Sequence, residues 1–211
     1  MPIDSGVMHV KHTHLRGWTL LLALLAFRCA SSGTPGVIEP RKDLSAADYY
    51  PMASGWKWAY DLEKDGTTML ATYAVLERTD TGAVIQAGDE RLAYAVTPDG
   101  VAQRDADAVG DYVIKNPLRV GNEWAVQGGR AKIVAVGEEV NVESIGRLRG
   151  CVTVEVTRSE PMRVTRTTFA PDVGPVAIEV LVQDGGRLVT SARAHLRAIT
   201  KPGQDLFADV R

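Results

Sequence analysis

Apolar and polar residues alternate along most of the chain after residue 55, which is the period of a β-strand with one buried face. In the first such segment Trp56, Trp58, Tyr60 and Leu62 fall on one face, while Lys57, Ala59, Asp61 and Glu63 fall on the other. The same alternation recurs at 151–158 and 174–183. The pattern predicts amphipathic strands, and no stretch after residue 50 has the period of a long helix.

Turn sequences rich in Asp and Gly separate these segments, at residues 64–66, 98–100 and 184–186. Such residues supply the positive φ angles of tight hairpins. Strands are therefore expected near 56–63, 68–78, 82–88, 91–97, 100–104, 111–115, 123–136, 151–158, 162–170, 174–183 and 187–199. Short strands spaced by about 8–12 residues predict an all-β fold, an antiparallel meander that forms a sandwich or a partly open barrel.

Three segments divide the chain: a signal peptide at 1–28, a tether at 29–48 and a single β-rich domain at 49–211. The tether contains Gly, Ser and Pro and precedes one predicted helical turn at 44–49, with Ser45 as its cap and Asp48 three residues later. The signal peptide has Lys11 and Arg16 ahead of an uncharged run from Trp18 to Phe27. A transmembrane helix needs about 20 apolar residues, whereas this run fits the h-region of an export signal.

Cys29 follows this run and is itself followed by a small, uncharged stretch. The arrangement resembles a bacterial lipoprotein signal, and the resemblance implies that Cys29 becomes an acylated first residue of the mature chain. Arg28 departs from the pattern, which has a small residue before the cysteine. The alternative is cleavage after Ser32, which would release a soluble periplasmic or secreted protein. Either route predicts an extracytoplasmic location, and acylation would anchor the chain in the outer membrane or at the cell surface.

A motif of the form P-Φ-x-x-G-x-x-W, where Φ is apolar, occurs twice, at 51–58 and 117–124. The motif could mark two matching ligand-binding edges, but no polar residue accompanies both copies, and a repeated way of entering a strand is favoured. Together with Tyr49-Tyr50, Gly150-Cys151-Val152 and 169–176, these residues resemble a group of uncharacterised bacterial secreted lipoproteins. The resemblance implies a β-rich extracytoplasmic domain and no particular activity.

Composition narrows the function further. The 211 residues are 45% hydrophobic and carry a formal net charge of -2, which argues against a disordered chain and against a nucleic-acid-binding protein. Two cysteines exclude a disulfide-rich scaffold and a four-cysteine zinc site. Three of the four histidines lie in the signal peptide, which leaves His195.

Candidate chemistry is sparse, and neither a cofactor nor a metal is predicted. The acidic stretch 105–111 only faintly resembles a calcium loop, because Val109 occupies a ligand position. His195 lies on a strand face that it shares with arginines, so a surface histidine is expected. Cys151 opens an alternating strand and is expected to be a buried structural thiol. No catalytic residue is therefore assigned.

The favoured interpretation is a non-catalytic envelope protein with a structural or interaction role, bound to the membrane through Cys29, with lipid or envelope proteins as partners. The first alternative is a carrier of a lipid or another apolar ligand, which Trp56, Trp58 and Trp124 could line. A carrier is expected to hold an internal cavity of roughly 300 Å³ or more. The second alternative, a soluble secreted hydrolase-like enzyme, is least favoured because the usual catalytic residues are scarce.

Overall fold

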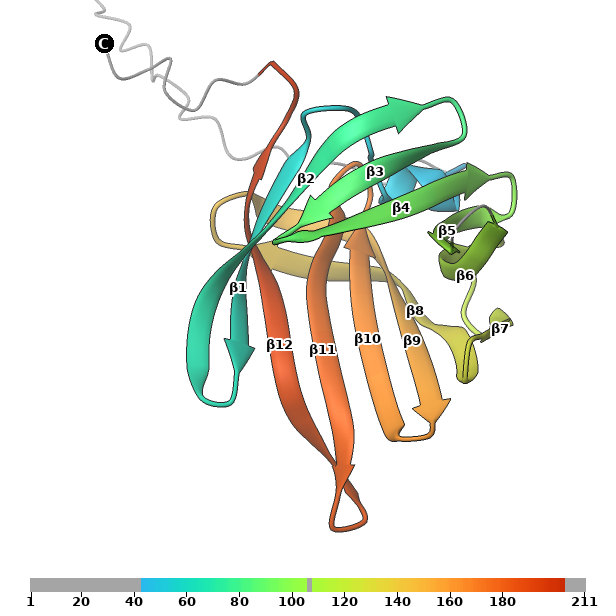
Figure 1. The fold of residues 1–211 in the computed structure, drawn as a ribbon, viewed down its shortest axis with the longest axis vertical. Helices are drawn as coiled ribbons and strands as arrows, with labels where there is room; N and C mark the ends of the chain where they lie inside the picture. The colour runs from blue at the N-terminus through green and yellow to red at the C-terminus, as the bar shows by residue number, and fades with distance from the viewer. Residues whose placement is uncertain (1–42, 106–107, 204–211) are drawn as a thin grey trace, which may run out of the picture. The chain divides into compact units, whose positions relative to one another are not determined.

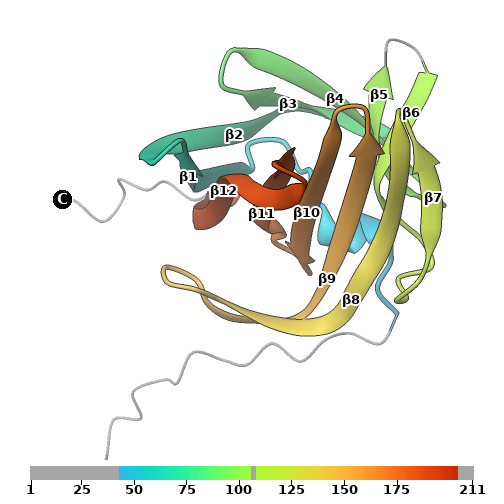
Figure 2. The same ribbon diagram turned by 90° about the horizontal axis from the view of Figure 1, so that it is seen from below.

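The computed structural model describes residues 43–105 and 108–203, and it confirms the all-β prediction. Twelve antiparallel strands form one nearly closed, barrel-like sheet (Figures 1 and 2). The strands are β1 Lys57–Lys64, β2 Thr67–Thr79, β3 Gly82–Ala87, β4 Glu90–Thr97, β5 Gly100–Asp105, β6 Ala108–Lys115, β7 Glu123–Val126, β8 Gly129–Val142, β9 Gly146–Ser159, β10 Met162–Ala170, β11 Gly174–Asp184 and β12 Arg187–Thr200. No helix within these ranges is long and apolar enough to cross a membrane.

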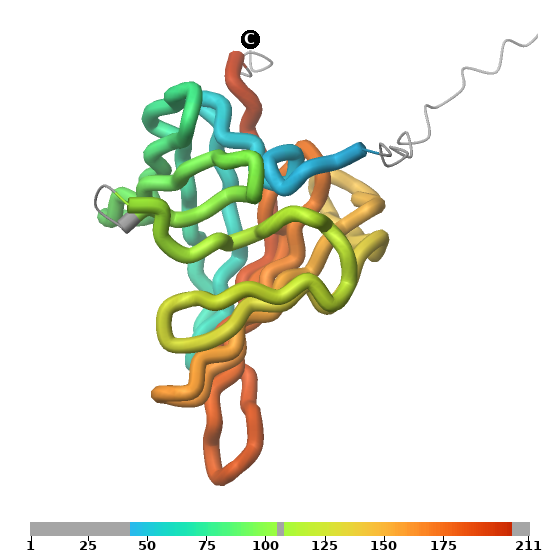
Figure 3. Tube along the Cα trace, turned by 90° about the vertical axis from the view of Figure 1, so that its right-hand side faces the viewer, coloured from blue at the N-terminus to red at the C-terminus, as the bar shows by residue number. Residues whose placement is uncertain are grey.

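The sheet is built from two six-stranded meanders. Its strand order is β6-β5-β4-β3-β2-β1-β12-β11-β10-β9-β8-β7, so β1 and β12 pair at the centre and β6 and β7 form the two edges. Figure 3 follows the chain from the first meander, in green, into the second, in yellow and orange. Within each half, strands that are consecutive in sequence are paired neighbours, whereas the segment from β6 to β7 connects the two edges.

Side chains join the two edge strands where the sheet curls back on itself. The Trp124 indole N–H on β7 donates to the carbonyl of Tyr112 on β6 at 2.9 Å. The Asp111 carboxylate of β6 accepts two bonds, at 2.8 and 3.0 Å, from the backbone N–H of Gln127 just after β7. Unpaired strand edges invite pairing with other chains. These bonds occupy polar groups of both edges and so hold the curled sheet together.

The repeated P-Φ-x-x-G-x-x-W motif makes the same structure at the start of each meander. Gly55 has φ +84 and donates its N–H to Val75, while Gly121 has φ +88 and donates to Ile133. In both copies the accepting strand residue also donates its own N–H to the carbonyl of the residue after the glycine. Val75 donates to Trp56 at 2.8 Å, and Ile133 donates to Asn122 at 2.9 Å. The glycine is needed because side chains rarely adopt this positive φ. The motif is therefore a strand-entry device.

Three predicted strands have wrong boundaries, and the smallest difference is that the strand expected at 111–115 begins at Ala108. The expected strand 123–136 is a hairpin, because the chain reverses at Gln127-Gly128 between β7 and β8, with Gly128 at φ +70. Strand β9 begins at Gly146, five residues before the predicted start, since it continues its pairing with the far end of β8. The predicted helical turn is confirmed as the 3-10 helix η1, Ala46–Tyr49, whose N-cap Ser45 donates its backbone N–H to the Asp48 carboxylate at 2.9 Å.

Candidate functional site

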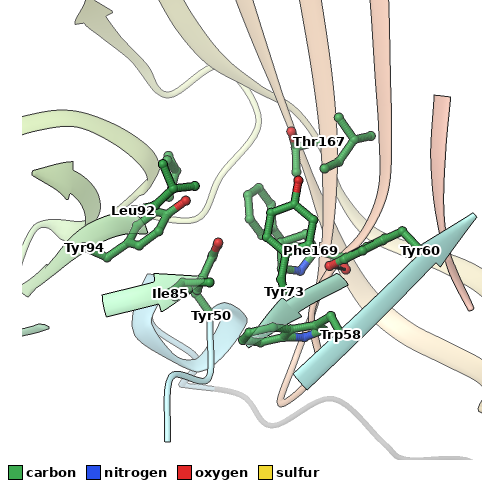
Figure 4. A pocket seen from close by; sticks show the side chains of 12 residues that line it. Tyr50, Trp58, Tyr60, Tyr73, Ile85, Leu92, Tyr94, Thr167 and Phe169 are labelled. Carbon is green, nitrogen blue, oxygen red and sulfur yellow. Dashed lines mark hydrogen bonds between the residues drawn. The ribbon is translucent and has the colours of Figure 1, made fainter. Parts of the chain in front are cut away.

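A cavity of about 200 Å³ lies between the curled halves of the sheet. Figure 4 shows aromatic rings gathered around it, from Tyr50 directly after η1 and from strands of both meanders. Its lining is Tyr50, Trp58, Tyr60, Tyr73, Ile85, Leu92, Tyr94, Val113, Thr167, Phe169, Pro175 and Ile178. About half of these residues are buried and half are partly exposed, so the cavity has a wall inside the core and a mouth toward solvent.

Strand alternation brings the aromatic residues to this face. Trp58 and Tyr60 lie two residues apart on β1, and both are almost fully buried, as the period-2 pattern predicts. Tyr73 follows on the paired strand β2, and its ring meets the Tyr60 ring edge-on, with centroids 5.4 Å apart. Tyr50 lies just after η1, and its ring centroid is 5.2 Å from that of Tyr94 on β4. These contacts make a continuous aromatic wall.

Buried hydrogen bonds fix two of the rings. The Trp58 indole N–H donates to the carbonyl of Val173 at 2.6 Å, and the Tyr60 hydroxyl donates to the carbonyl of Pro175 at 2.8 Å. Gly174 lies between these two acceptors with φ +100, and a Cβ there would come within 3.1 Å of the Trp58 indole nitrogen. The turn into β11 therefore holds both rings in place, and glycine is required where the backbone passes the indole.

The cavity wall is uncharged. Burial, followed by the neighbouring tyrosines, raises the pKa of Tyr50 and of Tyr60 well above the usual value of 10.0. Burial also raises the pKa of Tyr94. These phenols stay neutral at physiological pH. The described lining contains no Asp, Glu, His, Lys or Arg. An ionised ligand group would lose its hydration here without a counter-charge, so the cavity favours apolar or aromatic groups.

An open groove of about 790 Å³ adjoins the cavity on the inner face of the sheet. It is lined by Leu62, Lys64, Pro161, Met162, Arg163, Val180, Val182, Gln183, Ser191 and Ala192. Strand pairing connects the two spaces, because Leu62 of the groove lies in the same cross-strand row as Ile178 and Thr167 of the cavity. The aromatic cavity and the groove are therefore neighbours on one face of the sheet.

The three tryptophans named from sequence have different positions. Trp58 lines the cavity, whereas Trp56 packs behind it, with ring centroids 6.1 Å apart, and the Lys201 ammonium lies over the Trp56 ring. Trp124 lies at the joined edge of the sheet instead. Neither Trp56, which precedes β1, nor Trp124, on the edge strand β7, is among the lining residues. Cys29 and the signal peptide lie outside the described residues.

Sequence reasoning missed most of the cavity wall, including Tyr50, Tyr73, Tyr94 and Phe169. The available signal was weak: aromatic residues at inward positions of alternating strands. These residues come from parts of the chain up to about 120 positions apart, and only the closure of the sheet brings them together.

The residues considered for catalysis do not meet at the cavity. His195 lies exposed on β12, on the outer face, beside Asp61 of β1 and Ala177 of β11 in the strand pairing. Cys151 is fully buried, and burial raises the pKa of its thiol to about 11, so the nucleophilic thiolate is scarce at neutral pH. Within 43–105 and 108–203, no group of three or more His, Cys, Asp or Glu side chains could hold a metal ion. Part of the acidic stretch 105–111 lies outside the described residues.

Comparison with known proteins gives two structural neighbours. The first is a candidate exported protein with a YmcC-like fold from Bacteroides fragilis, with 14% identity and a TM-score of 0.47 over 72% of this chain and 98% of that one. The second is a candidate lipoprotein from Parabacteroides distasonis, with 12% identity and a TM-score of 0.40 over 74% of this chain and 100% of that one. No protein-family model matches the chain, and no curated protein matches it in sequence.

Proposed function

We propose that this chain is an exported, lipid-anchored envelope protein whose β-domain binds a small apolar ligand without catalysing a reaction. The observation that carries the proposal is the aromatic cavity. At about 200 Å³ it is smaller than the roughly 300 Å³ expected for a carrier of a whole lipid or drug-sized ligand. An engineered apolar cavity of about 150 Å³ in another protein binds benzene. The present cavity therefore suits one or two rings or the end of an alkyl chain.

The lining of the cavity favours ligand binding over a purely structural role. Its wall presents uncharged aromatic and aliphatic side chains to a space of about 200 Å³ that opens to solvent. An apolar group that enters this space removes apolar surface from water, which is favourable. A scaffold would gain by filling the space with larger side chains. An apolar ligand recovers the same packing only when it is bound.

A non-catalytic role agrees with the chemistry of the cavity wall. The hydroxyl groups of Tyr50, Tyr60 and Tyr94 have raised pKa values and serve as neutral polar contacts. The imidazole of His195 is exposed on the outer face of the sheet, and the thiol of Cys151 on β9 is fully buried. Extracytoplasmic location and membrane attachment rest on the export signal and on Cys29.

Binding is tested with decanol and the purified exported protein. Decanol is expected to raise the melting temperature of the wild type, because a ligand that binds the native state stabilises it. Ile178→Phe and Val113→Phe place extra bulk at the cavity and should reduce this shift, and two variants are used in case one folds poorly. Leu188→Phe is the matched control, because this exposed hairpin residue lies away from the cavity. An equal response in all four proteins would refute cavity binding.

Native mass spectrometry gives a second test of the same proposal. Protein purified gently from its host should carry an extra mass that is lost on denaturation, and Ile178→Phe should carry less of it. The anchor is tested separately by palmitate labelling, which should be present in wild type and absent in Cys29→Ala. A wild-type chain that never labels would refute the anchor and leave the ligand proposal standing.

A further inference from the structure

We infer that the ligand is a single-chain amphiphile with an anionic headgroup, whose tail enters the aromatic cavity and whose headgroup lies between Lys64 and Arg163. This inference rests on the proposed function and specifies its ligand. It is drawn from the groove that continues the cavity along the inner face of β1, β10, β11 and β12.

The pairing of the four strands shows how cavity and groove are joined. Three successive cross-strand rows run down the inner face, two residues apart along β10 and β11, while on β12 a register shift makes the second step three residues. The first is Leu62–Ala194–Ile178–Thr167, the second is Lys64–Ala192–Val180–Thr165, and the third is Val189–Val182–Arg163. The first row contains lining residues of both spaces, while the groove residues Lys64, Val180 and Arg163 lie in the next two.

The floor of the groove is apolar and partly exposed. Val180 and Val182 of β11 form its centre, with Leu62 on one side and Met162 on the other, and all four are half-buried. Two large apolar side chains beside it are more exposed: Met69, paired with Leu62, is 49% exposed, and Val189, paired with Val182, is 41% exposed. Contiguous exposed apolar surface of this kind marks a binding groove more often than an ordinary protein surface.

Charge distinguishes the far end of the groove from the cavity. Lys64 ends β1 and Arg163 lies at the start of β10, so the two cations stand on opposite sides of the groove, and both are exposed. The described lining of the groove includes these two cations and no carboxylate. The adjacent Glu63 belongs to the opposite face, where it is paired with Arg193 across the sheet. An anionic headgroup at the rim is therefore matched, while the uncharged cavity accepts the tail.

The dimensions suit one alkyl chain. From Thr167 at the cavity to Arg163 at the rim is four residues, or about 13 Å at ~3.3 Å per strand residue. An extended chain of about ten carbon atoms, with C–C bonds of ~1.5 Å, spans a similar length. A medium-chain carboxylate therefore reaches from the charged rim into the aromatic cavity, and decanoate is the matched probe for decanol.

The test measures binding of decanoate, decanol and decyltrimethylammonium to the full exported protein by calorimetry. Decanoate is expected to bind most tightly and decyltrimethylammonium most weakly. Lys64→Gln/Arg163→Gln should weaken the binding of decanoate roughly three- to tenfold, as expected for two exposed charges, and leave the affinity for decanol unchanged. Lys57→Gln/Arg104→Gln is the control, since it removes two exposed cations that do not line the groove. Added salt should weaken decanoate binding to the wild type and to the control variant, and should change it little in Lys64→Gln/Arg163→Gln.

The outcomes separate this inference from the proposed function. Suppose that decanol binds and that Ile178→Phe weakens its binding, but decanoate binds no more tightly than decanol and Lys64→Gln/Arg163→Gln does not change its affinity. The headgroup assignment is then wrong, and cavity binding stands. If neither amphiphile binds, both proposals fail. Capture by vesicles of anionic phospholipid without binding of monomeric decanoate would also overturn the inference, because the groove would then be a membrane-docking surface.

Discussion

Gly174→Ala tests how the turn into β11 positions the aromatic wall. The backbone at Gly174 has φ +100, and an added Cβ would lie 3.1 Å from the Trp58 indole nitrogen and 3.4 Å from two carbons of its second ring. A non-glycine residue in such a conformation costs about 1–3 kcal/mol, and overpacking of a buried contact costs about 1–3 kcal/mol more. Gly174→Ala is therefore expected to lower the free energy of unfolding by about 2–6 kcal/mol.

Two comparisons separate the backbone effect from the packing effect. Gly121 has a similar φ of +88, and a Cβ there would meet nothing within 4 Å, so Gly121→Ala reports the backbone cost alone. Trp58→Phe removes the indole nitrogen and the second ring that the new Cβ would strike. In that background Gly174→Ala should cost about 1–2 kcal/mol less than in wild type, since contacting residues couple in a double-mutant cycle.

Urea unfolding of the four proteins of the cycle and of Gly121→Ala provides the assay. The single change Trp58→Phe should itself cost about 1–3 kcal/mol, because the carbonyl of Val173 loses its buried donor. Equal destabilisation by Gly174→Ala and Gly121→Ala would contradict a clash with the indole. So would changes at 58 and 174 whose effects on the free energy of unfolding add to within about 0.5 kcal/mol.

Three further predictions concern the edge, the helical turn and the thiol. Trp124→Phe should cost about 1–3 kcal/mol and speed amide exchange in β6, since it removes the bond between the sheet edges; unchanged exchange would contradict this role. Tyr49 donates to the carbonyl of Gly150 at 2.7 Å, and burial raises its pKa to about 12. Because the folded pKa of Tyr49 exceeds the unfolded value of 10.0, its contribution to the free energy of unfolding should be present below pH 10 and disappear between pH 10 and 12. Tyr49→Phe should make the decrease in stability over this pH range smaller. In a Cys29→Ser chain, Cys151 should react with a thiol reagent at pH 8 only after unfolding, and rapid reaction of the native protein would show that the thiol is accessible.

The sequence predicted the strands well because each carries its own local signal. The alternation at Trp58 and Tyr60 gave both the strand and its buried face, and the glycines of the repeated motif have the positive φ expected of a turn. The split of 123–136 was missed although Gly128-Gly129 is a pair typical of hairpins and the buried positions change there from Trp124 and Val126 to Ala131 and Ile133.

The cavity could not be predicted from the same signals. Its walls depend on which strands face each other after the sheet curls. Alternation shows which face of a strand is buried but not which distant strand it faces. Trp124 illustrates the difference: the pattern correctly marks it as buried, but its indole bonds across the joined edges and does not face the cavity. The charged rim was missed for the same reason, since Lys64 and Arg163 are about 100 residues apart in sequence.

Occupancy of the aromatic cavity by an apolar ligand can be seen in a crystal structure of the protein purified gently from its own host. We expect continuous density for an apolar group among the rings of Tyr50, Trp58 and Phe169, running into the groove toward the rim. A cavity that is collapsed or filled by the protein's own side chains, with no ligand density, would contradict this occupancy.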